Sequence, residues 1–168
     1  MKTNSISFII SIVLFFACSP KSSSSDNVTQ DAAFTALEQL EEEIFNYSLG
    51  SNKNKLAKKG KALLISSKDY ISSHAGDPTL ERAYEMAALG AEVSGAYNDA
   101  INYLYLAQRN FPTSKKAPIY LFNRARILDD ILLKKRESEL AYRELIELYP
   151  GDSLSLSMKR YLESDLMN

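Results

Sequence analysis

Two groups of carboxylates and one imidazole are the side chains that could carry acid–base chemistry in this chain. The glutamates at 41–43 and the pair Asp129-Asp130 are adjacent carboxylates, and His74 is the single histidine. Paired carboxylates act as general acid and base when both reach one reacting group. Neighbouring helical residues point in different directions, and nothing apolar beside them is evident that would raise a carboxyl pKa. Both groups are therefore interpreted as solvated helix faces.

His74 has no serine, cysteine or aspartate at a recognised catalytic spacing, and it falls in an expected turn between helices. A structural or solvent-facing role is the favoured interpretation. The chain also contains no Gly-rich phosphate loop, no G-x-S-x-G and no H-E-x-x-H. The sequence therefore predicts a protein that is not an enzyme.

Composition limits the partners and cofactors. The chain has 20 Lys and Arg against 21 Asp and Glu, so there is no basic excess for nucleic-acid binding. A single cysteine, Cys18, excludes an intramolecular disulfide, and one histidine leaves too few soft ligands for a zinc or transition-metal site. We expect no nucleic acid, no metal and no cofactor.

The apolar run Phe8–Phe16 follows a positive start at Lys2. Its nine residues suit the core of a signal peptide and fall short of the ~20 that span a bilayer. The following Ala17-Cys18 resembles the lipobox of bacterial lipoproteins, although Phe15 stands where leucine is usual. The resemblance implies a signal peptide at 1–17 and acylation of Cys18, with palmitate-type chains on its sulfur and amine. A buried structural cysteine or an uncleaved anchor are the alternatives.

A polar stretch separates this cysteine from the rest of the chain. Residues 18–28, with serines at 22–25, cannot bury enough apolar surface to fold and are expected to form a flexible tether. Ser19 directly after the cysteine resembles the outer-membrane sorting signal of enteric lipoproteins. The resemblance implies an outer-membrane lipoprotein that faces the periplasm.

The chain's only basic cluster lies early in the remaining domain. It consists of Lys53, Lys55, Lys58, Lys59 and Lys61. Near an acylated N-terminus these lysines could contact anionic lipid or phosphate. No clean amphipathic stripe accompanies them, so a soluble helix face is the favoured interpretation.

Helical patterning dominates residues 29–168. Gly and Pro are few, and apolar residues recur at helical rather than alternating spacing. Asp77-Pro78 is a typical helix start, and the pairs Phe111-Pro112 and Tyr149-Pro150 are typical stops. Further breaks are expected at 50–52 and at Gly95, with late helices at about 116–133, about 137–149 and from Asp152 or Ser153 to about 166. An all-α fold follows.

An internal repeat narrows the fold. Phe111-Pro112 recurs as Tyr149-Pro150 at an offset of 38 residues, and the same offset relates Tyr84 to Phe122 and Ala87 to Ala125. Counting back from Pro112 gives the following pattern of aromatic, small and turn residues: Tyr84, Ala87, Ala88, Gly95, Tyr97, Ala100, Leu104 and Ala107.

This pattern resembles the tetratricopeptide repeat, a pair of antiparallel helices. The second repeat keeps Phe122, Ala125, Tyr142, Leu145 and Pro150, but Leu133 and Lys135 replace the turn glycine and the aromatic that follows it. The resemblance implies a right-handed superhelix of about three helix pairs with a C-terminal capping helix. An ordinary helical bundle is the alternative.

The junctions around Pro112 and Pro150 resemble those of bacterial envelope repeat proteins. Examples are the barrel-assembly lipoprotein and the Tol-Pal coordinator, and small lipoproteins of Bacteroidota are similar in type. The resemblance implies a lipid-anchored interaction or scaffold protein, for example an accessory subunit of an outer-membrane complex. An envelope enzyme, or a protein that binds cell wall or glycan on the same scaffold, is the alternative.

In this family the first helix of each repeat lines the concave face, where a protein or peptide binds. The resemblance therefore implies a partner-binding set made of Arg82, Glu85, Leu89, Glu92, Tyr120, Asn123, Ile127 and Asp130. Its three acids and one arginine favour a basic or neutral segment with an apolar anchor. Tyr120 is expected to be the main contact if it is exposed. The alternative is that Tyr120 packs beneath the preceding repeat.

Overall fold

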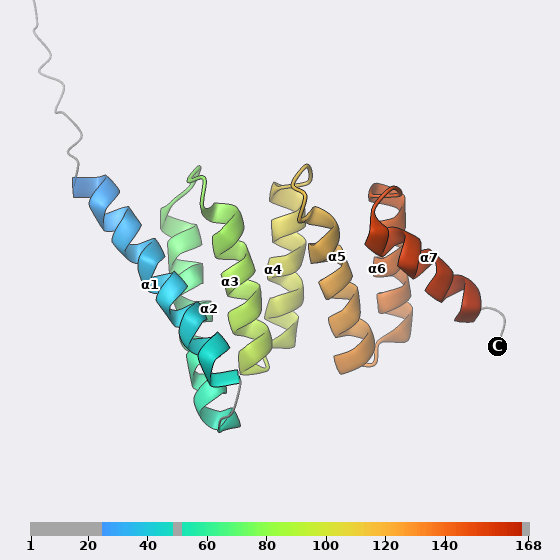
Figure 1. Ribbon diagram of the computed structural model, residues 1–168, viewed down its shortest axis with the longest axis horizontal. Coiled ribbons are helices and arrows are strands. Elements are labelled where there is room, and N and C mark those ends of the chain that lie inside the picture. Colours follow the sequence, from blue (N-terminus) through green and yellow to red (C-terminus); the bar gives the residue numbers. More distant parts are fainter. Residues whose placement is uncertain (1–24, 49–51, 166–168) are drawn as a thin grey trace, which may run out of the picture.

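The computed structural model describes residues 25–48 and 52–165, and this part of the chain is helical without any strand (Figure 1). The expected all-α class is confirmed. The elements are α1 (Ser25–Ser48), α2 (Lys53–Ser73), α3 (Leu80–Ser94), α4 (Tyr97–Asn110), α5 (Ala117–Arg126), a π-helical turn (Ile127–Ile131), α6 (Lys135–Leu148) and α7 (Ser153–Asp165).

Each helix packs on the next one along the chain. In Figure 1 the helices stand side by side in chain order, with α1, α3, α5 and α7 nearer the viewer and α2, α4 and α6 behind them. Contacts between α1 and α3 and between α5 and α7 agree with this arrangement. The first helix of every expected pair therefore lies on one common face. None of the described helices is both long and apolar enough to cross a membrane.

Helix boundaries differ from expectation at three places. α1 begins at Ser25, so it includes residues 25–28, which were expected to form the end of the tether. α3 begins at Leu80 rather than Pro78, because Asp77-Pro78 forms a turn closed by a hydrogen bond from Leu80 N to the Asp77 carbonyl (3.1 Å). The expected helix at 116–133 is interrupted after Arg126 by the π-helical turn.

Small residues form the seam between α3 and α4. Ala87, Ala100 and Ala107, which belong to the repeat pattern, are each at most 1% exposed, and so is Ala91, which the pattern did not include. Short side chains let two helices approach closely. Leu104 packs in the same core cluster as Ala91 and Ala100.

The two proline junctions are in direct contact. The Tyr149 hydroxyl donates a hydrogen bond to the Pro112 carbonyl (2.9 Å), and the Gln108 amide donates one to the Tyr149 oxygen (3.2 Å). Tyr149-Pro150 thus packs against its counterpart Phe111-Pro112. The 38-residue offset in the sequence corresponds to neighbouring positions in space.

Candidate functional site

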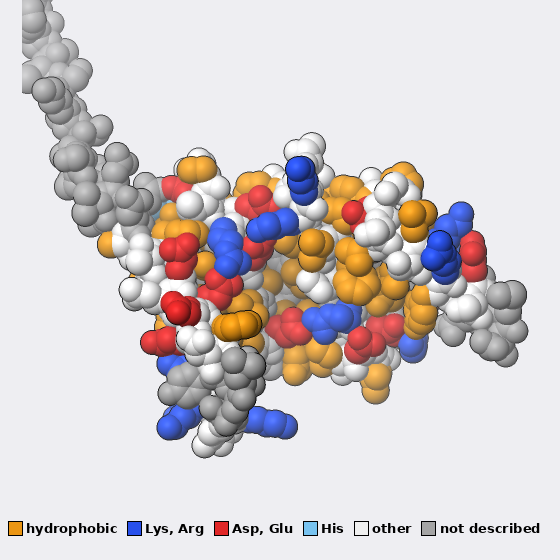
Figure 2. Space-filling model, in the orientation of Figure 1, with side chains coloured by type: hydrophobic (Ala, Val, Ile, Leu, Met, Phe, Trp, Pro, Cys, Tyr) orange, Lys and Arg blue, Asp and Glu red, His pale blue; other side chains and the backbone are white. Residues whose placement is uncertain are grey.

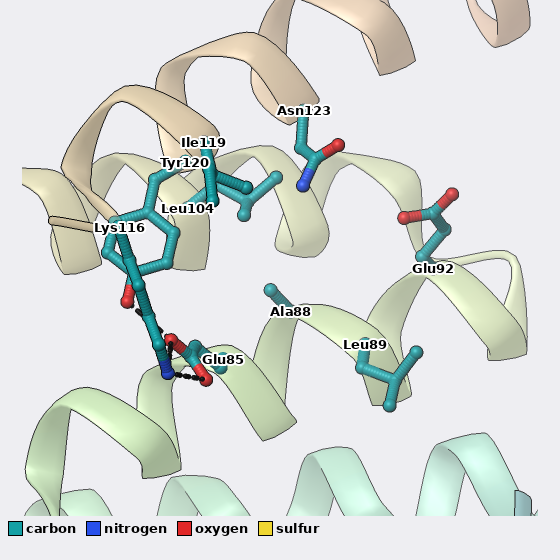
Figure 3. A pocket seen from close by; sticks show the side chains of 9 residues that line it. All are labelled: Glu85, Ala88, Leu89, Glu92, Leu104, Lys116, Ile119, Tyr120 and Asn123. Atoms are coloured by element: carbon teal, nitrogen blue, oxygen red, sulfur yellow. Dashed lines mark hydrogen bonds and ion pairs between the residues drawn. The ribbon is translucent and has the colours of Figure 1, made fainter. Parts of the chain in front are cut away.

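A groove of about 340 Å³ lies between α3 and α5 (Figure 3). It is lined by Glu85, Ala88, Leu89, Glu92, Leu104, Lys116, Ile119, Tyr120 and Asn123. Five of the eight residues expected on the concave face line it: Glu85, Leu89, Glu92, Tyr120 and Asn123. Arg82 adjoins the groove through an ion pair with Glu85 (3.0 Å).

Besides Arg82, two expected residues do not line this groove. Ile127 has no exposed surface and packs in the core with Ala91 and Leu104, so its expected place on the binding face is wrong. The π-helical turn starts at this residue. Asp130 is exposed but does not line the groove.

Tyr120 is 3% exposed, so its expected role as an exposed anchor is wrong. Tyr120 instead packs beneath the preceding repeat, which was the alternative, because its hydroxyl reaches back to α3. Its single O–H proton is shared between Glu81 Oε1 (2.8 Å) and Glu85 Oε1 (2.5 Å). Burial and these two carboxylates raise the pKa of Tyr120 above its ordinary value. Its ring forms a wall of the groove while its hydroxyl joins α5 to α3.

Glu85 is the centre of the polar side of the groove. Lys116 Nζ lies 2.8 Å from Glu85 Oε1 (Figure 3), and Arg82 Nη1 lies 3.0 Å from Glu85 Oε2. Burial acts to raise the pKa of Glu85, but hydrogen bonds from Lys116, Tyr120 and Arg82 outweigh it and lower the pKa below its ordinary value. Glu85 is therefore a fixed anion in this groove.

The opposite end of the groove has a second ion pair and one available amide. Glu92 binds Arg126 at 2.7 Å, and both side chains are about one-third exposed. Asn123 also lines the groove, and its amide has no hydrogen-bond partner among the described residues. This amide can donate to and accept from the backbone of a bound segment.

Ile119 is the apolar contact that the sequence analysis missed. It is 45% exposed on the first turn of α5 and lies over the groove, whose floor is Ala88 and Leu104. In the 38-residue frame it corresponds to Glu81, so the repeat pattern did not mark it as apolar. An exposed isoleucine over an apolar floor is a suitable contact for an apolar side chain of a partner.

A second hollow of about 430 Å³ lies between α1 and α3. It is lined by Glu38, Glu41, Glu42, Ile44, Phe45, Leu89 and Val93. Figure 2, which views the same face as Figure 1, shows acidic side chains gathered over α1. No residue of α1 was in the predicted set, because the first helix pair carries only the helical period and not the repeat pattern.

The carboxylates first considered for catalysis have separate environments. Glu41 forms an ion pair with Arg82, whereas Glu42 is exposed. Asp130 is exposed, but Asp129 is only 5% exposed, so its interpretation as a solvated residue is wrong.

Asp129 is held by groups from two helices. Its Oδ1 lies 2.6 Å from Lys135 Nζ, and its Oδ2 accepts a hydrogen bond from the Tyr161 hydroxyl (3.2 Å). Burial and the nearby carboxylates Asp129 and Asp130 raise the pKa of Tyr142 to about 12. This cluster joins the π-helical turn to α6 and α7.

The single histidine closes the turn between α2 and α3. Its ring stacks on Tyr70 with centroids 4.0 Å apart, and its Nδ1 lies 3.0 Å from the Tyr70 carbonyl oxygen. In the described residues no three His, Cys, Asp or Glu side chains are placed to hold a metal ion.

The lysine cluster begins at Lys53, beyond the C-terminal end of α1, whereas Ser25 lies at the other end of that 24-residue helix. A helix of this length spans about 36 Å. Lys59 is bound to Glu43 at 2.5 Å. The lysines are thus remote from the point at which the described chain begins. Cys18 itself lies outside the described residues.

No family model, curated protein or solved structure matches this chain.

Proposed function

We propose that this chain is a lipid-anchored interaction protein of the bacterial envelope, whose tetratricopeptide-like domain binds a segment of another protein. Cys18 is the acylated residue and residues 1–17 are the signal peptide. The domain is a right-handed superhelix of three helix pairs with α7 as its cap. The protein acts as a scaffold or accessory subunit at the outer membrane, facing the periplasm.

The observation that carries this proposal is the groove between α3 and α5. It combines an apolar floor at Ala88 and Leu104, an exposed isoleucine at 119 and polar groups at Glu85 and Asn123. Binding sites for protein segments commonly pair an apolar anchor point with a few placed polar groups. The row of helices with first helices on one face agrees with a repeat domain.

Site-specific crosslinking tests the proposal in living cells. A photoreactive amino acid at position 119 should crosslink to one abundant protein. The same group at position 140 is the control, because Leu140 is 61% exposed and lies outside the groove. The same crosslinked proteins in equal amounts at both positions, or no crosslinked protein at 119, would contradict binding in this groove. Release of glycan fragments by the purified chain would instead support the enzymatic alternative.

A further inference from the structure

We propose that the hollow between α1 and α3 extends the groove and selects a partner segment that carries lysine or arginine beside an apolar anchor. This inference rests on the proposed function, since it defines the chemistry of the segment bound there. It adds α1 to the site and assigns its carboxylates a role in recognition.

The two hollows share a lining residue. Leu89 on α3 lines both of them, with Ala88 and Leu104 on one side and Ile44 and Val93 on the other. Ile44 is 4% exposed, so the floor beneath α1 is as apolar as the floor beneath α5. A partner segment lying across α3 would contact both floors at once.

The rim of the combined surface is acidic. Five of its lining residues are glutamates, and Lys116 is the one lining cation among the described residues. The neighbouring cations Arg82 and Arg126 are already bound, Arg82 to Glu41 and Glu85 and Arg126 to Glu92. The surface therefore has unbalanced negative charge even when these arginines are counted.

Glu38 and Glu42 carry this excess. Both are exposed on α1, and neither has an ion-pair partner in the described part of the chain. They are four residues apart, where two like charges destabilise a helix. A cation from a partner would relieve this repulsion. An acidic segment would increase it, so charge complementarity favours a cationic one.

Three labelled peptides that differ only in charge test the inference on the full-length chain in a non-ionic detergent. All carry leucines at helical spacing, and the remaining positions hold lysine in one peptide, glutamine in the second and glutamate in the third. We expect the lysine peptide to bind most tightly and the glutamate peptide most weakly. Added salt should reduce the advantage of the lysine peptide, because exposed charges are screened.

Charge removal on α1 identifies the source of this preference. Glu38→Gln and Glu42→Gln should each weaken binding of the lysine peptide by about 1.5- to 5-fold, the range for an exposed ion pair. Binding of the glutamine peptide should not change. Glu147→Gln and Glu163→Gln remove the same charge from exposed positions on α6 and α7 and should have no effect.

The outcomes separate this inference from the proposed function. If lysine and glutamine peptides bind equally and Ile119→Asp abolishes both, the groove binds segments but the inference is overturned. If none of the three peptides binds, both the inference and the proposed function are contradicted. Sedimentation of the chain as a dimer that dissociates in Glu38→Gln would also overturn the inference, in favour of a second copy as the occupant.

Discussion

Leu133 adopts the same left-handed backbone as Gly95, the residue 38 positions before it. The φ angle is 53° at Leu133 and 81° at Gly95. Gly95 ends α3, where its N–H and that of Ala96 satisfy carbonyls of the last turn. Leu133 makes the corresponding turn before α6, although a Cβ atom disfavours this conformation by about 1–2 kcal/mol.

Replacing Leu133 with glycine should therefore stabilise the protein. We expect a gain of about 0.5–1 kcal/mol in the free energy of unfolding, measured by chemical denaturation, because the strain exceeds the added entropy of the unfolded chain. Leu133 is 75% exposed, so little packing is lost. Leu133→Ala is the control, since it keeps the Cβ atom. If the glycine variant were no more stable than the alanine variant, the backbone at residue 133 would not be strained.

A close approach of α2 and α3 predicts a destabilising substitution at Gly90. A Cβ atom there would lie 2.6 Å from Leu64 N and 2.7 Å from the Gly60 carbonyl oxygen. Both contacts are backbone, so relief requires the helices to separate. Gly90→Ala should lower the free energy of unfolding by about 1–3 kcal/mol, measured by thermal melting, despite the better helix propensity of alanine. Gly151→Ala, with no atom within 4 Å of the added Cβ, should change stability by less than about 0.5 kcal/mol.

Tyr120 is expected to affect folding more than binding. Tyr120→Phe removes the hydroxyl that joins α5 to Glu81 and Glu85, at a cost of about 1–2 kcal/mol. Tyr120→Ala also empties a buried site and should cost about 3–5 kcal/mol. Ile119→Ala, at the adjacent exposed position, should lower the melting temperature little. Equal melting temperatures for Tyr120→Ala and the unmodified protein would contradict the buried position.

The lowered pKa of Glu85 predicts sensitivity to acid. Its ionised form stabilises the fold above the ordinary carboxyl value of 4.5, and this contribution is lost as the pH falls through the lower pKa of the folded state. The melting temperature of Glu85→Gln should therefore be lower near neutral pH and converge with that of the unmodified protein in acid. A constant difference from pH 7 to 3 would show that Glu85 is not the group responsible.

Acylation of Cys18 is tested in cells supplied with a labelled fatty acid. The unmodified protein should take up the label and sediment with membranes. Cys18→Ala should do neither, because the sulfur that carries the lipid is gone. Label and membrane association that persist in this variant would exclude lipidation at Cys18. Ser19→Ala is the control, since it changes the neighbouring residue and keeps the sulfur.

The repeat pattern predicted the parts of the fold that depend on small residues and breaks. Ala87 and Ala107 are buried in the seam, and Gly95 ends α3, because these residue types have strong local or packing preferences. Leu133 was expected to lie at a helix end, but nothing in a leucine indicates a left-handed turn. The π-helical turn likewise has no sequence signal in the residues 127–131.

The groove was predicted in outline from the repeat frame. The pattern identified Glu85 and Leu89 as groove residues because the neighbouring residues of α3 match the repeat pattern. It missed Ile119, which departs from the character of its counterpart Glu81, and it placed Ile127 on the binding face although this residue is buried. The carboxylates of α1 could not be predicted, since their role depends on how α1 packs against α3.

The packing of each helix on its neighbours in the chain also affects how the domain folds. Among the α-helices of the described chain, contacts join only those that are adjacent or next but one, so little loop entropy is lost before a helix pair becomes stable. Rapid folding is expected, and α1 and α2 can pair before α6 and α7 have been synthesised. A chain emerging from a ribosome or a membrane channel can therefore acquire its structure progressively, from the first helix to the last.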